Sequence, residues 1–116
     1  MAGRWNTSVT VDARECGEGI YTYTNVLTVT QAGNNVTISG TDDEGNDFVF
    51  YGTVSGNTVT ASGSYSDGSG TTTLSGITYT FTENSFSGHS SWTWRFQSKY
   101  TSGYCAGTDT FRGTKL

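Results

Sequence analysis

The sequence contains no proline, and the residues that most favour helices, Leu, Ala, Lys and Glu, are scarce. Thr, Ser and Gly dominate instead, and aromatic residues make up 14% of the chain. Threonine and aromatic side chains favour β-strands, because they pack well on a pleated surface. The composition therefore excludes a mainly helical protein and predicts an all-β fold.

Positive charge is also rare. The chain carries six Lys and Arg residues against ten Asp and Glu, has a formal net charge of -4, and contains no run of basic residues. Binding to nucleic acid or to an anionic membrane surface depends on a basic patch. We therefore expect no nucleic-acid partner.

Long apolar runs are missing as well. No segment approaches the roughly 20 consecutive apolar residues that a membrane-spanning helix needs. The strands of an outer-membrane barrel would need an apolar outer face, but both faces of the alternating segments here are rich in Thr and Ser. The sequence predicts a soluble protein without a membrane span.

The chain has two cysteines, Cys16 and Cys105, and neither lies in a CxxC or Cys/His motif of the kind that binds metal or carries redox chemistry. An even number of cysteines in a small chain predicts a disulfide and an oxidising compartment, with two buried free thiols as the alternative. The chain begins Met1-Ala2-Gly3 without an apolar signal region, which we interpret as a start placed where a signal peptide was removed. We predict a secreted or periplasmic protein.

The segment from Ser91 to Gln97 is the one around which the other segments are organised. Trp92, Trp94 and Phe96 alternate with polar residues in it. Successive side chains of a strand point to opposite faces, so the three aromatic residues share one face. The segment is predicted to be a strand with one dry face and one wet face.

With 116 residues the chain can build one core but not two, so residues 1–116 are expected to form a single domain. Alternating segments follow one another along it, joined by short turns such as 32–35 and 55–57, whose Gly and Asn residues tolerate positive φ. Eight or nine such strands form an up-and-down meander. Closing the meander removes its two exposed edges, so we predict a single closed antiparallel β-barrel of about eight strands.

Two local irregularities are also expected. The apolar residues change parity near Asn25, which indicates a bulge or bend in the second strand. Gly76 separates a short strand, 71–75, from a longer one, 77–82.

The two ends of the chain are consistent with closure. Facing positions on paired antiparallel strands have residue numbers with a constant sum. Pairing Cys16 with Cys105, and Trp5 with Lys115 or Arg112, gives nearly the same sum. The first and last strands are therefore expected to be neighbours.

Gly3-Arg4-Trp5 at the start of the first strand, with Arg112 or Lys115 available to lie over the indole, resembles the signature of the calycins, the group of lipocalins, fatty-acid-binding proteins and avidins. The size and short turns are most similar to the avidin barrel. The resemblance implies a calycin-like barrel with a small-molecule pocket and a structural role for Trp5 and Arg112 at the closed end. A cation stacked on an indole contributes about 1–2 kcal/mol there.

The resemblance does not extend to biotin. In avidins a polar cluster holds the ligand, and the residues that could imitate part of it here are Asn6, Ser8 and Asp109. The first two have the opposite strand parity to Trp5 and would face away from the interior. We do not expect biotin to be the ligand.

The leading functional hypothesis is an aromatic-lined pocket for a hydrophobic or aromatic small molecule, with tyrosine hydroxyls supplying polar contacts. Small eight-stranded barrels are either filled by side chains or hold one ligand, so a filled core is the alternative. The residues predicted to line the pocket are Trp92, Trp94, Tyr79, Phe81, Tyr65 and Phe50.

No metal or cofactor is predicted. His89, the single histidine, has no Cys, Asp or Glu at the spacing of a metal site. The acidic segment 42–47 has oxygen ligands but lacks the 12-residue spacing of a Ca²⁺ loop. We interpret this segment as a solvated hairpin loop.

Two other functions stay open. A barrel-type cyclase or isomerase would use the same pocket, with Glu83, a tyrosine or His89 as acid or base, but a buried carboxyl group is hard to find, so we lean away from an enzyme. A surface-interaction or carbohydrate-binding module would use aromatic residues outside the barrel and needs no cavity. An oligomer is compatible with either.

Overall fold

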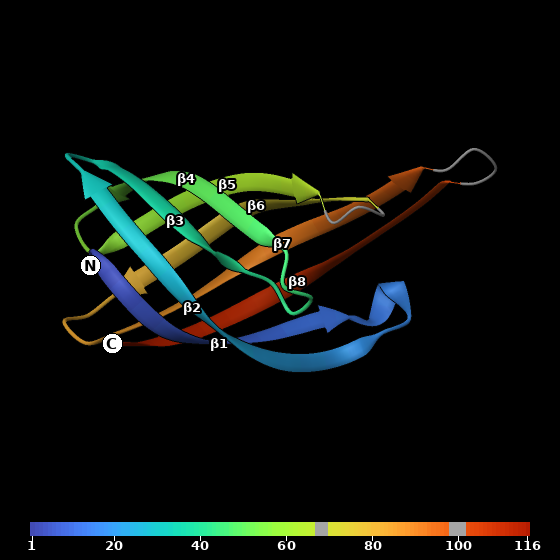
Figure 1. The fold of residues 1–116 in the computed structure, drawn as a ribbon, viewed down its shortest axis with the longest axis horizontal. Helices are drawn as coiled ribbons and strands as arrows, with labels where there is room; N and C mark the ends of the chain where they lie inside the picture. The colour runs from blue at the N-terminus through green and yellow to red at the C-terminus, as the bar shows by residue number, and fades with distance from the viewer. Residues whose placement is uncertain (67–69, 98–101) are drawn as a thin grey trace.

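The protein is a closed barrel of eight antiparallel strands in up-and-down order (Figure 1). The computed structural model describes residues 1–66, 70–97 and 102–116. The strands are β1 (Gly3–Ala13), β2 (Gly19–Ala32), β3 (Asn35–Thr41), β4 (Asp47–Ser55), β5 (Thr58–Ser66), β6 (Thr71–Phe81), β7 (Ser85–Gln97) and β8 (Ser102–Lys115). A short 3-10 helix, η1 (Arg14–Cys16), joins β1 to β2. The predicted fold class is confirmed.

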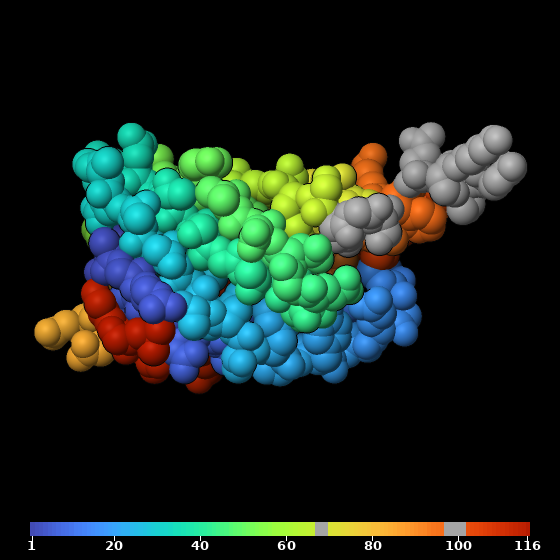
Figure 2. All heavy atoms as spheres, viewed as in Figure 1, coloured from blue at the N-terminus to red at the C-terminus, as the bar shows by residue number. Residues whose placement is uncertain are grey.

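Pairing of the first and last strands closes the barrel. β1 and β8 pair from Trp5 opposite Lys115 to Asp12 opposite Thr108. Figure 2 shows the two ends of the chain, in blue and red, side by side at one end of the molecule. The prediction that the termini are neighbours is confirmed, and the sheet has no free edge.

The strands bury alternate residues because the pleat sends every second side chain inward. In β1 the inward residues are Trp5, Thr7, Val9, Val11 and Ala13. The Trp92, Trp94 and Phe96 face of β7 also points inward, as its alternation predicts.

Trp5 plugs the end of the barrel that carries the termini. Its side chain is fully buried, and its ring meets Phe81 and Phe86 edge-on, with centroids 5.2 and 5.5 Å away. The Trp5 Nε1–H donates to the Met1 carbonyl at 2.8 Å. The cation over the indole is Lys115, whose Nζ lies 5.3 Å from the ring centroid.

Of the two cations that the resemblance offered for this position, Lys115 occupies it, and the structural role assigned to Arg112 needs correcting. Arg112 pairs with Ser8 on the outer face of the barrel, and its side chain is exposed. The parity of β8 is the reason: Phe111 points inward, so its neighbour Arg112 points outward.

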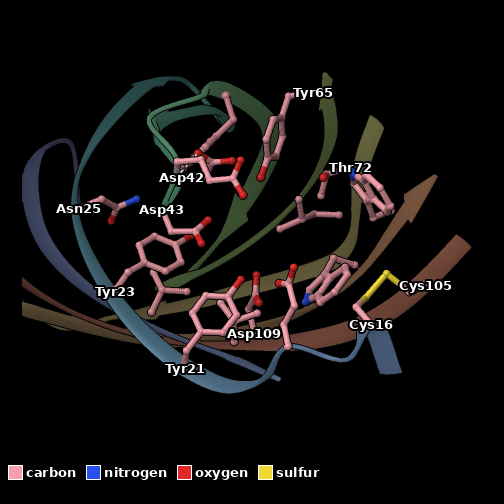
Figure 3. Close-up of a pocket in the computed structure, with 18 of the residues that line it drawn as sticks. Cys16, Tyr21, Tyr23, Asn25, Asp42, Asp43, Tyr65, Thr72, Cys105 and Asp109 are labelled. Atoms are coloured by element: carbon pink, nitrogen blue, oxygen red, sulfur yellow. Dashed lines mark hydrogen bonds between the residues drawn. A yellow bond between two sulfur atoms is a disulfide. The ribbon is translucent and has the colours of Figure 1, made fainter. Parts of the chain in front are cut away.

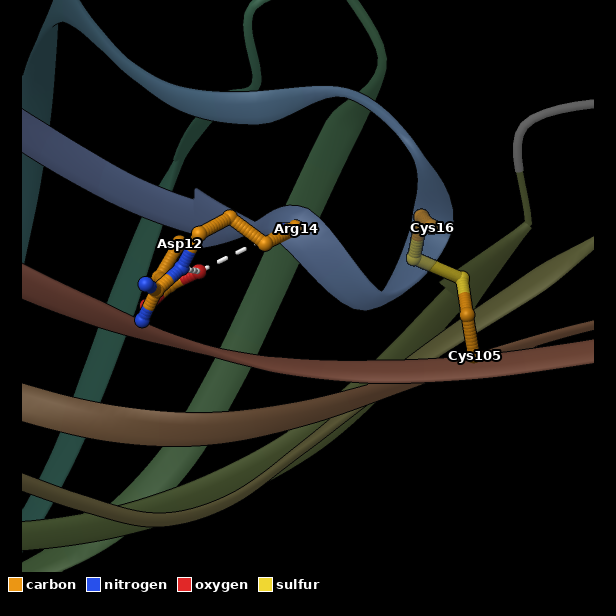
Figure 4. The surroundings of a disulfide bond; sticks show 4 residues. All are labelled: Asp12, Arg14, Cys16 and Cys105. Carbon is orange, nitrogen blue, oxygen red and sulfur yellow. Dashed lines mark hydrogen bonds and ion pairs between the residues drawn. A yellow bond between two sulfur atoms is a disulfide. The ribbon is translucent and has the colours of Figure 1, made fainter.

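A disulfide between Cys16 and Cys105 fastens the opposite end (Figure 4), as predicted. It ties η1 to β8, with the two Cα atoms 5.4 Å apart. Gly17 follows η1 with a φ of 81°, a conformation that favours glycine and lets the chain reverse into β2. The neighbouring ion pair between Arg14 and Asp12, at 2.8 Å, is exposed and contributes little to stability.

Glycines in β8 make room for the aromatic residues of β7. Three inward aromatic rings each lie across a directly paired glycine, in the pairs Phe96–Gly103, Trp92–Gly107 and Phe86–Gly113. A Cβ atom placed on Gly113 would lie 2.1 Å from Phe86 Cε1. A side chain in place of any of these three glycines would therefore overlap the ring that faces it.

The two expected irregularities have different outcomes. Gly76, with a φ of 60°, lies where the pairing of β6 shifts register, so one bulged strand replaces the two predicted strands. β2 has no bulge near Asn25, and its pairing with β1 runs without interruption. The parity argument was wrong there because Val26 lies on the outer face, 36% exposed.

Removing both cysteines should lower stability without opening the barrel. The disulfide links residues 89 positions apart, for which the chain-entropy model gives roughly 4–5 kcal/mol. We expect the Cys16→Ser/Cys105→Ser variant to lose about 2–5 kcal/mol of unfolding free energy, measured by urea denaturation. Reductant should destabilise the native protein to the same extent and leave the variant unchanged; equal urea midpoints for both proteins would contradict this.

Gly113→Ala should destabilise the closed end. The added methyl meets the Phe86 ring, which is buried against Trp5 and Tyr79 and has no room to move. Overpacking of this kind costs about 1–3 kcal/mol. Urea denaturation measures it, and Ser87→Ala, on the exposed face beside Phe86, is the control that should stay within about 0.5 kcal/mol of wild type.

Candidate ligand-binding site

A cavity of about 480 Å³ lies inside the barrel between the Trp5 plug and the end that carries η1 (Figure 3). Its floor is apolar, formed by buried side chains that include Val9, Leu27 and Phe111. Eleven aromatic residues take part in the lining: Tyr21, Tyr23, Phe48, Phe50, Tyr65, Tyr79, Trp92, Trp94, Phe96, Tyr104 and Phe111. Side chains therefore do not fill the whole interior.

The structure brings together five of the six residues predicted to line the pocket. Trp92, Trp94, Tyr79, Tyr65 and Phe50 all face the cavity. Their contact with a ligand stays a prediction.

Phe81 is the exception and needs correcting. It is 4% exposed and packs against Trp5, Phe86 and Tyr79 in the plug. β6 runs from the mouth toward the closed end, so Tyr79 still borders the cavity but Phe81, two residues on, lies beyond its floor.

The mouth of the cavity is acidic, which the sequence analysis missed. Carboxylates from two turns line it: Glu15 in η1 and Glu18 just after it, and Asp42, Asp43 and Glu44 between β3 and β4. In Figure 3 Asp42 and Asp43 point from their turn toward the centre of the cavity.

Asp42 gives the β3–β4 turn its shape. Its Oδ1 accepts hydrogen bonds from the backbone N–H of Glu44 at 2.9 Å and of Asn46 at 2.8 Å. Aspartate forms such turns because its short side chain reaches the backbone two residues on. The segment predicted to be a solvated hairpin loop is the turn of the β3–β4 hairpin, largely exposed, and it borders the mouth.

Asp109 is a carboxyl group deep in the barrel. It lies on β8 between Val11 of β1 and Ser90 of β7, and is 8% exposed. Its Oδ1 is buried and has no hydrogen-bond partner among the described residues, and the same is true of Trp92 Nε1. Burial raises the pKa of Asp109 to about 7; the nearby indole N–H of Trp92 lowers it in part, and the charge of Asp43 raises it further.

Four tyrosines keep their protons over a wide pH range. Burial is the main cause that raises the pKa of Tyr21, Tyr23, Tyr65 and Tyr79 above the ordinary value. Nearby carboxylates add to it: Asp43 for Tyr21, Asp42 for Tyr65, and Asp109 for Tyr23 and Tyr79. The phenols therefore serve as neutral hydrogen-bond donors around the cavity.

Of the three groups named as acid or base for an enzyme, a tyrosine is present in the cavity lining, whereas Glu83 and His89 lie outside the cavity. Glu83 is exposed in the β6–β7 turn at the closed end, and His89 is exposed on the outer face, opposite Thr78 and Thr110. Asn6 and Ser8 also face outward, as their parity predicts. The buried carboxyl that such an enzyme requires is Asp109.

Among residues 1–66, 70–97 and 102–116, no three His, Cys, Asp or Glu side chains are grouped so that they could hold a metal ion. No helix in the same residues has the length and apolar character to cross a membrane. The carboxylates at the mouth are thus spread around an opening and do not form a coordination shell.

No protein-family model and no curated sequence matches this chain. The resemblance to calycins therefore stays a prediction based on Trp5 and the barrel ends.

Asp109 should make the protein less stable as the pH rises. An aspartate in the unfolded chain has a pKa near 3.8, while the folded value is about 7, so between these values the folded state keeps a proton that the unfolded chain has lost. The free energy of unfolding then falls from about pH 4 to pH 7 and stays low above that. Asp109→Asn removes this loss, and we expect the variant to match wild type near pH 4 and to exceed it at pH 8 by on the order of 4 kcal/mol.

Urea denaturation across this pH range measures the effect. Asp47→Asn, at an exposed carboxyl outside the cavity, is the matched control and should follow the wild-type profile. An Asp109→Asn profile parallel to wild type at all pH values would show that Asp109 titrates normally.

Proposed function

We propose that the protein is a secreted binding protein that holds a small hydrophobic or aromatic molecule inside its barrel. The observation that carries the proposal is the cavity of about 480 Å³ with an apolar, aromatic lining and one open end. Ligand sites are typically cavities of about 300–1,000 Å³ that are mostly apolar, with a few polar groups that orient the ligand. Here the tyrosine hydroxyls and Asp109 supply those groups.

The rigid frame around the cavity supports a preformed site. Trp5 and its aromatic neighbours close one end, and the disulfide holds η1 at the other. A site that is already shaped loses little conformational entropy when a ligand binds. A flat molecule could thus stack on aromatic rings of the lining without a large rearrangement of the barrel.

The same disulfide supports a compartment outside the cytosol. A Cys16–Cys105 bond persists in oxidising surroundings and is rare where thiols are kept reduced. Secretion or export to a periplasm is therefore part of the proposal, and encounter with a ligand would take place there.

Asp109 favours one second candidate, an enzyme that moves a proton on the bound molecule. General acids and bases work best when their pKa lies near the working pH, and the pKa of Asp109 is about 7. Such a carboxyl inside a cavity is a recognised mark of active sites, although buried structural groups show it as well. An isomerase or cyclase that uses Asp109 is the alternative to simple binding.

Filling the cavity should abolish binding. Val11 lines the cavity and is 6% exposed, so Val11→Phe places a larger side chain inside. We expect the wild-type protein to bind the neutral probes Nile red and 2-(1-naphthyl)ethanol, and Val11→Phe to weaken binding at least about tenfold because overlapping volumes exclude each other. Fluorescence titration and isothermal calorimetry measure the two affinities.

Val49→Phe is the matched control, since Val49 is 41% exposed on the outer face of β4. It should bind both probes as wild type does, and thermal unfolding would verify that both variants fold. A loss of binding in Val49→Phe alone would instead indicate a surface-interaction module, and no binding by the wild-type protein would contradict the proposal.

A further inference from the structure

The charged residues that line the cavity in the described part of the chain are all acidic. They are six of its nine acidic residues: Glu15, Glu18, Asp42, Asp43, Glu44 and Asp109. No Lys, Arg or His in the described part of the chain lines the cavity. A field of this kind attracts cations and repels anions.

Three basic residues of the described part of the chain are engaged elsewhere. Arg14 pairs with Asp12 at 2.8 Å, Arg95 lies over Tyr104 with its Cζ 5.1 Å from the ring centroid, and Lys115 lies over Trp5 at the closed end. None of these three cations lines the cavity, so none of them neutralises the carboxylates there.

Two buried oxygen acceptors of the lining lack a donor. Asp109 Oδ1 is one, and Asn25 Oδ1 is the other. Asn25 Nδ2 donates to the Thr41 carbonyl at 2.7 Å, an orientation that leaves Oδ1 unbonded (Figure 3). A buried acceptor without a partner is costly, and a bound molecule with N–H donors would remove that cost.

We propose that the ligand is a protonated organic amine, with its apolar or aromatic body on the aromatic floor and its ammonium group on the Asp109 carboxylate. The inference rests on the proposed binding function and names its ligand class. An ammonium group is attracted both by a carboxylate and by the faces of aromatic rings, and the lining supplies both. A bare metal ion fits less well, because the described residues contain no group of three metal ligands.

A matched series of probes tests the charge: 2-(1-naphthyl)ethylamine, 2-(1-naphthyl)ethanol and 1-naphthaleneacetate, titrated by calorimetry at pH 8. The three share a ring system and differ mainly in charge. We expect the amine to bind at least about tenfold tighter than the alcohol, and the acetate to bind more weakly than either, because charge-assisted hydrogen bonds exceed neutral ones by that margin.

Asp109→Asn tests the proposed contact. It should weaken binding of the amine by about tenfold to a hundredfold, and it should weaken binding of the alcohol much less, because the alcohol can lose only a neutral hydrogen bond at Asp109. Thermal unfolding verifies that the variant still folds. Asp47→Asn, outside the cavity, is the control and should bind all three probes as wild type does.

The outcomes separate the two proposals. Tighter binding of the alcohol than of the amine, or an equal loss of both in Asp109→Asn, would overturn the amine inference and leave the binding function standing. If wild type binds neither the amine nor the alcohol, and Nile red also fails to bind, both proposals are wrong.

Discussion

Pairing of β1 with β8 is the constraint on which the remaining structure depends. Once these strands join, every inward side chain faces one shared interior. Part of this interior is filled by side chains and part of it stays open as the cavity. At one end the aromatic cluster around Trp5 fills it, with Phe81 and Phe86 packed edge-on against the indole. At the other end the disulfide ties η1 to β8, and Glu15 and Cys16 of η1 border the cavity. The same barrel is thus closed at one end and open at the other.

Polarity changes along the barrel axis in step with this division. The floor is formed by aliphatic and aromatic residues, a layer of tyrosine hydroxyls follows, and the carboxylates of the two turns lie at the rim. Asp109 breaks this order because it is an acidic residue below the rim, where water is scarce. Burying a carboxyl without a partner opposes folding. Asp109 therefore lowers the stability of the barrel at the same place where it lines the cavity of the proposed ligand.

Most of the fold could be predicted from the sequence, because alternation and Gly/Asn turns are local signals. The strand around Trp92 and the pairing of the chain ends followed from parity and residue numbers alone. The acidic mouth could not be derived as easily: whether the turn at Asp42 points outward or across the opening depends on contacts distant in sequence. A signal was nonetheless present, since the β1–β2 and β3–β4 turns of an up-and-down barrel must lie at one end. Asp109 also shares the parity of Phe111, an inward residue, so its orientation could have been inferred.

Both termini emerge beside the Trp5 plug, where the Leu116 N–H donates to the Arg4 carbonyl at 3.0 Å. Any further domain, anchor or tag attached to either end would therefore project from the sealed base and leave the rim unobstructed. A short linker between the two ends, combined with a cut in an exposed turn between two strands, would likewise give a circular permutant with the same barrel. The molecule can thus be tethered, or displayed in tandem, with its opening directed away from the attachment point.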